Sequence, residues 1–229
     1  MKQKLRSGSI TGKVFAPQQK MEISKNDLRK IFKEKRLALT PEERREFSSR
    51  ICCNAAKTDI FKESLCVAFY AADNSEADLW ELFERFSGEK KFFLPRYKAE
   101  EKIYEMVQIH NRSNDLVTGK YGLAEPRAEL PPASQNEYEC MLYLVPGVAF
   151  DSQCRRLGRG KGFYDRLLAD AKFSMGIFYE CQRFEGDIPA EPHDINLDII
   201  VTEKQLYHTP AERKQCRIKT NEIEKGKQK

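Results

Sequence analysis

A glycine-rich turn that follows an apolar run constrains the fold of this chain more than any other feature. Residues 144–151 read Leu-Val-Pro-Gly-Val-Ala-Phe-Asp, and residues 156–165 read Arg-Leu-Gly-Arg-Gly-Lys-Gly-Phe-Tyr-Asp. Glycines let backbone N–H groups approach an anion closely, while the alternating cations and a following helix N-terminus add positive charge. The segment therefore predicts a phosphate-binding turn that leads from a strand into a helix.

Two common phosphate-binding patterns do not match this turn. The Walker pattern requires Ser or Thr directly after its lysine, whereas Gly162 follows Lys161. The dinucleotide fingerprint requires a glycine three residues after its second glycine, whereas Phe163 stands three residues after Gly160. The turn alone thus indicates phosphate chemistry without indicating the ligand.

Strand-like and helical segments alternate along most of the chain. Two helices are predicted first, over residues 25–38 and from 41 to about 55, with Ser24 and Thr40 as N-caps. From this alternation we predict a three-layer α/β/α, Rossmann-like fold with a mostly parallel central sheet, preceded by these two helices. The strands are expected at 65–72, 91–97, 103–109, 141–145, 173–179 and 195–201, with helices at 77–86 and from the glycine turn to about 171.

The positive charge is concentrated near the two ends of the chain. Residues 1–20 carry +5 and residues 210–229 carry +4 of a total of +5, which leaves −4 on residues 21–209. Basic ends of this kind are more often solvated tails than binding arms. We predict a poorly structured extension at 1–20, one α/β domain at 21–209, with Met21 as an alternative start, and a basic tail at 210–229.

Composition excludes several other classes of protein. No apolar run approaches the roughly 18 residues of a membrane span, and the basic N-terminus lacks the apolar region of a secretory signal. The seven cysteines are scattered and form no C-x-x-C pair, which is typical of reduced thiols. We expect a cytoplasmic monomer that binds neither a membrane nor a nucleic acid.

A stripe of cations runs along the first predicted helix. Lys25, Arg29, Lys33 and Arg36 share one side of it, beside the apolar face. Such a stripe is usually a solvated face, so these residues alone do not indicate a ligand.

Several segments together resemble the 5-formyltetrahydrofolate cyclo-ligase (methenyltetrahydrofolate synthetase) family over residues 23–203. The similarity includes the basic first helix, the glycine turn and the acidic segment around Asp194. The similar segments are residues 25–33, 41–44, 70–76, 94–97, 106–107, 122–126, 156–165 and 193–198.

This resemblance implies the residues of the site. Glu76, which the residues alone leave equally open as a helix cap, becomes a folate ligand. Mg²⁺ is implied at Asp165 and Asp194, and we expect Arg159 and Lys161 to be catalytic. ATP would be bound by Lys25, Arg29, Lys33, Arg156, Leu157, Gly158, Arg159, Gly160, Lys161, Gly162, Phe163 and Tyr164, and the folate by Ala71, Glu76, Met106, Arg159, Gly160, Lys161, Gly162 and Phe163.

The resemblance also implies the reaction. The family converts 5-formyltetrahydrofolate and ATP, with Mg²⁺, into 5,10-methenyltetrahydrofolate, ADP and phosphate, and its folate substrate can carry several glutamates. A folate- or nucleotide-binding relative without turnover, an RNA-binding module that uses the basic tails, and a sugar-phosphate enzyme with the same sheet remain as alternatives.

Two residues depart from the family's pattern. Cys154 stands where the family usually has a glycine, so its turn must either avoid a positive φ or tolerate strain. Phe163 replaces a tyrosine, which removes a hydroxyl group but keeps an aromatic ring.

Overall fold

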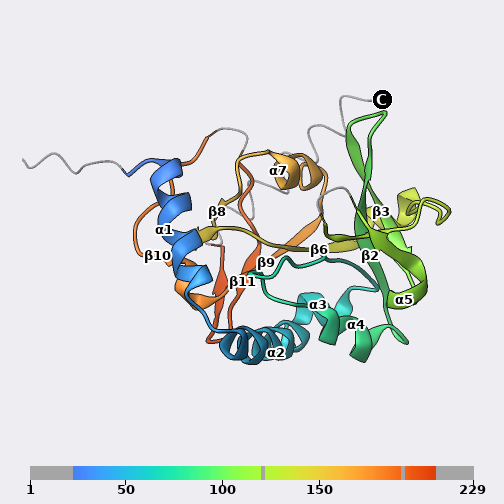
Figure 1. The fold of residues 1–229 in the computed structure, drawn as a ribbon, viewed down its shortest axis with the longest axis horizontal. Coiled ribbons are helices and arrows are strands. Elements are labelled where there is room, and N and C mark those ends of the chain that lie inside the picture. The colour runs from blue at the N-terminus through green and yellow to red at the C-terminus, as the bar shows by residue number, and fades with distance from the viewer. Residues whose placement is uncertain (1–22, 120–121, 192–193, 210–229) are drawn as a thin grey trace, which may run out of the picture.

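A seven-stranded sheet forms the centre of the computed structural model, which describes residues 23–119, 122–191 and 194–209. The two edge strands are antiparallel to their neighbours and the five strands between them are parallel, which confirms the mostly parallel sheet. In spatial order the strands are β12 (Leu206–His208), β11 (Ile199–Val201), β9 (Phe173–Ile177), β6 (Met141–Val145), β1 (Cys66–Ala68), β2 (Lys91–Lys98) and β3 (Ile103–Ile109) (Figure 1).

Helices and a small sheet cover the two faces of this central sheet and confirm the three-layer arrangement. On one face, α2 (Pro41–Lys57), α3 (Asp59–Glu63) and α4 (Trp80–Phe86) bury their apolar side chains against the strands (Figure 1). The other face is covered by α6 (Gln135–Glu139), α7 (Phe163–Leu167) and a small sheet of β10 (Arg183–Phe184), β7 (Ala149–Asp151) and β8 (Arg156–Leu157).

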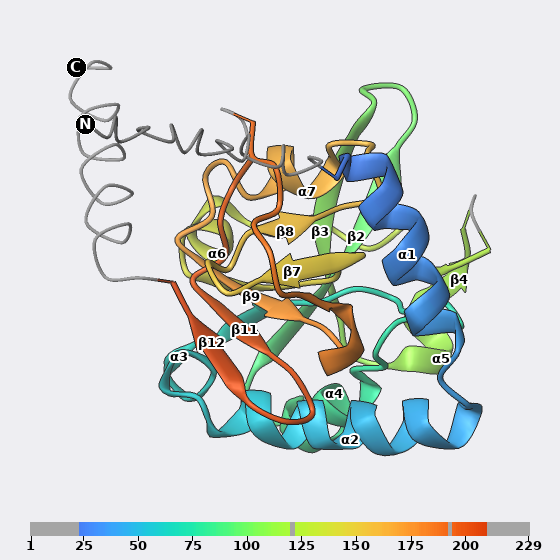
Figure 2. The ribbon, with the colours of Figure 1, turned by 90° about the vertical axis from the view of Figure 1, so that its left-hand side faces the viewer.

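The two predicted N-terminal helices are present. The first, α1 (Lys25–Leu37), is capped by Ser24, and α2 begins with a complete capping box between Thr40 and Glu43. Figure 2 shows α1 standing beside β7 and β8, against which Leu28 and Phe32 are buried. The remaining elements are α5 (Arg112–Asp115), β4 (Leu116–Thr118), β5 (Ala124–Pro126) and the 3₁₀ turn η1 (Glu180–Gln182).

The segment around the glycine turn differs from the prediction in two ways. A hairpin of β7 and β8 lies between β6 and the turn, so the turn does not follow the core strand directly. The helix after the turn, predicted to extend to about 171, ends at Leu167. Because α7 has only five residues, its helix dipole adds less positive charge to the turn than a long helix would.

The β7–β8 hairpin contains Cys154, for which the sequence could not decide between a negative φ and a strained positive φ. Cys154 has φ 56°, follows a turn in which its N–H donates to the carbonyl of Asp151 at 3.1 Å, and is fully buried. A glycine is the usual residue at this position of a three-residue hairpin loop. The turn therefore tolerates the strain instead of avoiding a positive φ.

Substitutions at Cys154 are expected to separate this strain from packing. Cys154→Gly should leave the free energy of unfolding within about 1 kcal/mol of the wild-type value, because relief of the left-handed backbone offsets the lost burial of the thiol. Cys154→Val should lower it by about 2 kcal/mol or more, because a β-branched side chain resists this φ. Denaturant unfolding measures both; equal stability of the glycine and valine variants would contradict the assignment.

Some predictions lie outside the described residues. These are the extension at 1–20 with Met21 as an alternative start, and the tail at 210–229. Within the described part of the chain, no helix combines the length and apolarity needed to cross a membrane.

Candidate functional site

A cavity of about 420 Å³ lies beyond the carboxyl ends of β1 and β6. Tyr70 and Ala71, which follow β1, and Pro146 and Gly147, which follow β6, line one part of it. The chain passes from β1 to β2 on one side and only later to β6 on the other, so the strand order reverses here. Open α/β sheets bind ligands at such a switch point.

The glycine turn, residues 158–162, lines another part of the cavity. Gly160 and Gly162 have φ values of +88° and +62°, which other residues rarely adopt. The Nε of Arg29 donates a hydrogen bond of 2.9 Å to the carbonyl of Gly158, and a Cβ at Gly160 would lie 3.4 Å from the same guanidinium. Helix α1 therefore holds the turn in place through Arg29.

Across the cavity, Arg159 meets two carboxylates of the loop after β1. It forms ion pairs with Asp73 and, at 2.6 Å, with Oε1 of Glu76. Glu76 is also 3.7 Å from the buried Arg36, and its side chain is only 8% exposed. It does not cap α4, which begins at Trp80; its Oε2 instead accepts from the N–H of Asp73 at 3.2 Å.

The two carboxylates have opposite pKa shifts. Burial raises the pKa of Glu76 above its ordinary value, against the lowering effect of Arg159. Burial also acts to raise the pKa of Asp73, but hydrogen bonds from Ser75 and the pairing with Arg159 outweigh it and lower that pKa to about 2. Asp73 thus remains charged at neutral pH and holds Arg159 against the loop.

Arg156 differs from the other cations of the glycine segment because it is buried. Its side chain is 4% exposed, donates to Oδ1 of Asp165 at 2.6 Å and packs over the ring of Tyr164. A Cβ at Gly158 would lie 2.7 Å from its NH1 atom. The Arg156 side chain therefore packs against the glycine turn at Gly158. It also forms an ion pair with Asp165, one of the two predicted magnesium ligands.

The second predicted magnesium ligand lies in another ion pair. The Nζ of Lys25 donates to Oδ2 of Asp194 at 2.7 Å and to Oε1 of Glu191 at 2.8 Å. Asp165 lines the cavity and Asp194 does not. Within residues 23–119, 122–191 and 194–209, no three His, Cys, Asp or Glu side chains form a metal-binding group.

The structure places the other predicted residues in different surroundings. Phe163 and Tyr164 line the cavity, whereas Leu157 is buried beneath α1. Met106 is buried in the core, opposite Pro95 in the β2–β3 ladder, and only Pro95 of this pair lines the cavity. Lys33 is exposed and does not line the cavity.

Asp73, Tyr104 and Glu125 are among the cavity residues that were not predicted as ligands. Asp73 lies in a loop whose similarity to the family was noted, but its pairing with Arg159 spans 86 residues of sequence. Tyr104 and Glu125 line the cavity from β3 and β5. Glu125 belongs to the segment 122–126, whose similarity to the family was noted. For Tyr104, the sequence indicated only that it lies in a strand.

Comparisons with known proteins agree on one family. A model of the 5-formyltetrahydrofolate cyclo-ligase family matches residues 21–203. The probable 5-formyltetrahydrofolate cyclo-ligase of Schizosaccharomyces pombe is 32% identical over 53% of this chain and 65% of its own length. The 5-formyltetrahydrofolate cyclo-ligase of Mycolicibacterium smegmatis is 38% identical over 41% of this chain and 49% of its own length. The matched part of the chain thus spans less than two thirds of either relative.

A solved structure extends the match over more of the chain. The NMR structure of 5,10-methenyltetrahydrofolate synthetase from Aquifex aeolicus superposes with a TM-score of 0.70 at 37% sequence identity. The superposition covers 80% of this chain and 92% of that protein. The similarity therefore extends over most of the chain and is not confined to the glycine turn.

Proposed function

Because the chain belongs to the 5-formyltetrahydrofolate cyclo-ligase family, we propose that it is a ligase that converts 5-formyltetrahydrofolate and ATP into 5,10-methenyltetrahydrofolate, ADP and phosphate. One observation carries the proposal: the glycine turn with its two cations faces, across one cavity, the loops that follow β1 and β6. This arrangement offers backbone N–H groups and positive charge to phosphate on one side and a partly apolar wall on the other.

The chemistry requires activation of the formyl oxygen, which is a poor leaving group in a formamide. Transfer of the γ-phosphoryl group of ATP to this oxygen forms an O–P bond and releases ADP. N10 of the folate then attacks the formyl carbon, and the C–O bond breaks as phosphate leaves. No protein nucleophile takes part, so the chain contributes position and charge.

Arg159 and Lys161 are the residues to which we assign that charge. Both line the cavity, and they alternate with the glycines whose N–H groups can approach phosphate. About half of the Arg159 side chain is exposed, so its remaining N–H donors can reach a phosphoryl group while Asp73 and Glu76 hold the guanidinium. The transferring phosphoryl group would thus meet fixed cations in a partly enclosed site.

The predicted magnesium site fits the chemistry of the residues in part. Carboxylate oxygens suit Mg²⁺, which commonly takes only one or two of them besides nucleotide phosphates and water. Asp165 lies on the cavity wall and is our primary candidate, with Asp194 as the second. Bound there, Mg²⁺ would neutralise phosphate charge.

We assign the nucleotide to the cations of α1, which are expected to contribute unequally. Arg29→Ala should lower kcat/KM for ATP about 10- to 100-fold, because it removes both a cation and the bond that holds the carbonyl of Gly158. Lys33→Ala should lower it by no more than about threefold, because Lys33 is exposed and lies outside the cavity wall. Steady-state kinetics with varied ATP measures both; equal effects would contradict the role of Arg29 in holding the turn.

The proposed function is tested with purified protein, 5-formyltetrahydrofolate, ATP and Mg²⁺. We expect formation of the methenyl product, followed by its near-ultraviolet absorbance, only when both substrates are present, with one phosphate released per product. Binding of both compounds without product would instead identify a relative without turnover and overturn the proposal.

A further inference from the structure

Two cysteines lie next to each other at the amino ends of β1 and β6, whereas the cavity of the candidate site lies beyond the carboxyl ends of these strands. Cys66 is the first residue of β1, and Cys140 directly precedes β6. The two strands are parallel neighbours in which Cys66 is paired with Met141. Strand geometry then places the Cα atoms of Cys66 and Cys140 about 6 Å apart, a separation that a disulfide spans.

The side chains of these two cysteines are in contact. Their thiols form a hydrogen bond with each other, and the Cys140 thiol also donates to the carbonyl of Glu137 at 3.6 Å. Both are free thiols; Cys140 is exposed, whereas Cys66 is 4% exposed. Solvent and small solutes can therefore reach one thiol directly, and the other lies behind it.

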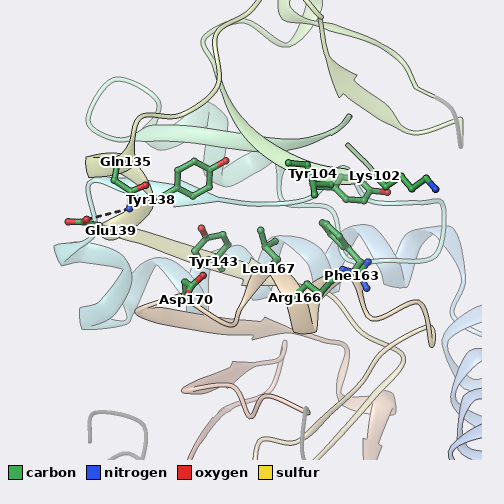
Figure 3. A pocket seen from close by; sticks show the side chains of 11 residues that line it. Lys102, Tyr104, Gln135, Tyr138, Glu139, Tyr143, Phe163, Arg166, Leu167 and Asp170 are labelled. Carbon is green, nitrogen blue, oxygen red and sulfur yellow. Dashed lines mark hydrogen bonds between the residues drawn. The ribbon is translucent and has the colours of Figure 1, made fainter. Parts of the chain in front are cut away.

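The position of Cys140 is fixed by α6, which ends at this residue. Figure 3 shows Tyr138 and Glu139, the two preceding residues, along one side of a second cavity of about 350 Å³. The hydroxyl of Tyr138 accepts from the N–H of Met106 in β3 at 2.7 Å. This bond holds the end of α6 against the central sheet, so the two thiols can be joined without a large movement of the helix.

A cation and a carboxylate lie beside the two thiols. Lys91 of β2 is paired with Cys66 across β1, and its Nζ forms an ion pair of 2.7 Å with Glu137 of α6. Burial raises the pKa of Cys66 to about 12, and its hydrogen bond to Cys140 and the charge of Glu137 also act to raise it, against the lowering effect of Lys91. Because Cys66 is protonated at neutral pH, the exposed Cys140 is the thiol that reacts first with a small oxidant.

We propose that Cys66 and Cys140 form a reversible disulfide by exchange with a small disulfide such as glutathione disulfide. The thiolate of Cys140 attacks one sulfur of glutathione disulfide, so that a mixed disulfide forms and one glutathione thiolate leaves. Cys66 then loses its proton to solvent and attacks the Cys140 sulfur, which releases the second glutathione thiolate. The two cysteines are oxidised and glutathione disulfide is reduced to two glutathione thiols, which can reverse both steps.

Disulfide formation at this place does not depend on the proposed ligase activity, and peptide mapping by mass spectrometry tests it on the full chain. Reduced protein is incubated with glutathione disulfide, remaining thiols are alkylated, and the protein is digested without reductant. In the wild type we expect a glutathione adduct on Cys140 that converts into a disulfide with Cys66 and is lost on treatment with dithiothreitol. Cys66→Ser should stop at the adduct. Conversion should be faster at alkaline than at neutral pH, because more of Cys66 is then thiolate.

Thermal unfolding of the same samples measures the effect of the bond on the fold. The linked wild type should melt at least about 4 °C above the reduced protein, because the disulfide closes a long loop of the chain. Cys140→Ser should lose both the link and this shift. Cys53→Ser is the matched control: Cys53 is half-buried on α2, its Sγ accepts from Arg85 at 3.6 Å, and its removal should change neither result.

Three results would overturn the proposal. The first is a wild type that retains the glutathione adduct on Cys140 without forming the link. The second is a link that forms only in denaturant, or other cysteine pairs that form as readily as Cys66 with Cys140. The third is a linked protein that melts below the reduced one, because the bond would then distort the fold instead of joining thiols that are already in contact.

Discussion

Lys161→Ala is expected to lower kcat/KM by about 10²- to 10³-fold while the melting temperature changes by less than about 2 °C. Lys161 is exposed between two glycines with positive φ, and it lines the cavity. Removal of one preorganised charge from a phosphoryl-transfer site has an effect of this size, whereas truncation of an exposed loop side chain rarely affects stability. Kinetics and thermal unfolding of the same preparation measure the two quantities.

Lys204→Ala and Arg156→Ala are the two comparison variants for this prediction. Lys204 is exposed on the turn between β11 and β12, away from the cavity, so its loss should affect neither quantity. Arg156→Ala should lower both, because the buried guanidinium supports the glycine turn and pairs with Asp165. A loss of stability with Lys161→Ala as large as with Arg156→Ala would contradict a direct role of Lys161 in charge neutralisation.

Glu76→Ala is expected to lower the free energy of unfolding by about 3–5 kcal/mol. The substitution leaves the buried Arg36 without its carboxylate, and an uncompensated buried charge has a cost of this order. Denaturant unfolding at neutral pH measures the effect. Asp73→Ala is the informative comparison, because Asp73 pairs with the half-exposed Arg159 and not with Arg36; its loss should destabilise the protein less.

The pH dependence of the unfolding free energy of Glu76→Gln tests the raised pKa of Glu76. The pKa of Glu76 is higher in the folded protein than the ordinary value of 4.5, so folding favours the protonated carboxyl group. The pH-dependent part of its contribution to stability is present below pH 4.5 and is lost as the pH rises through the folded pKa. Relative to the wild type, Glu76→Gln should therefore gain stability as the pH rises through this window. A constant difference across the window would contradict the raised pKa.

The alternation of apolar runs and the capping residues were sufficient to predict the layered fold. Ser24 and Thr40 mark the starts of two helices because a cap depends on neighbours within four residues. The β7–β8 hairpin was missed because strands of two or three residues have no detectable period. The helix after the glycine turn was predicted to reach about residue 171, whereas α7 ends at Leu167.

Residues that were predicted from one local motif lie together in the structure. The glycine turn lines one cavity with Ala71 and Glu76, and the ligand roles of these residues stay predictions. The ion pair between Lys25 and Asp194 joins residues 169 positions apart, and no pattern in the sequence indicates that a predicted nucleotide ligand neutralises a predicted metal ligand. The burial of individual cations could not be predicted from the sequence either. Arg36 and Lys33 belong to one stripe of cations, yet of these two only Arg36 is buried.

The central claim, that the cavity aligns ATP with the formyl oxygen of the folate, is tested most directly by isotope transfer. The protein is incubated with ATP, Mg²⁺ and 5-formyltetrahydrofolate carrying oxygen-18 in the formyl group, and the released phosphate is analysed by mass spectrometry. We expect one labelled oxygen in each phosphate released, because the C–O bond of the formyl group breaks after phosphorylation. Unlabelled phosphate, with the label recovered in water, would contradict the claim.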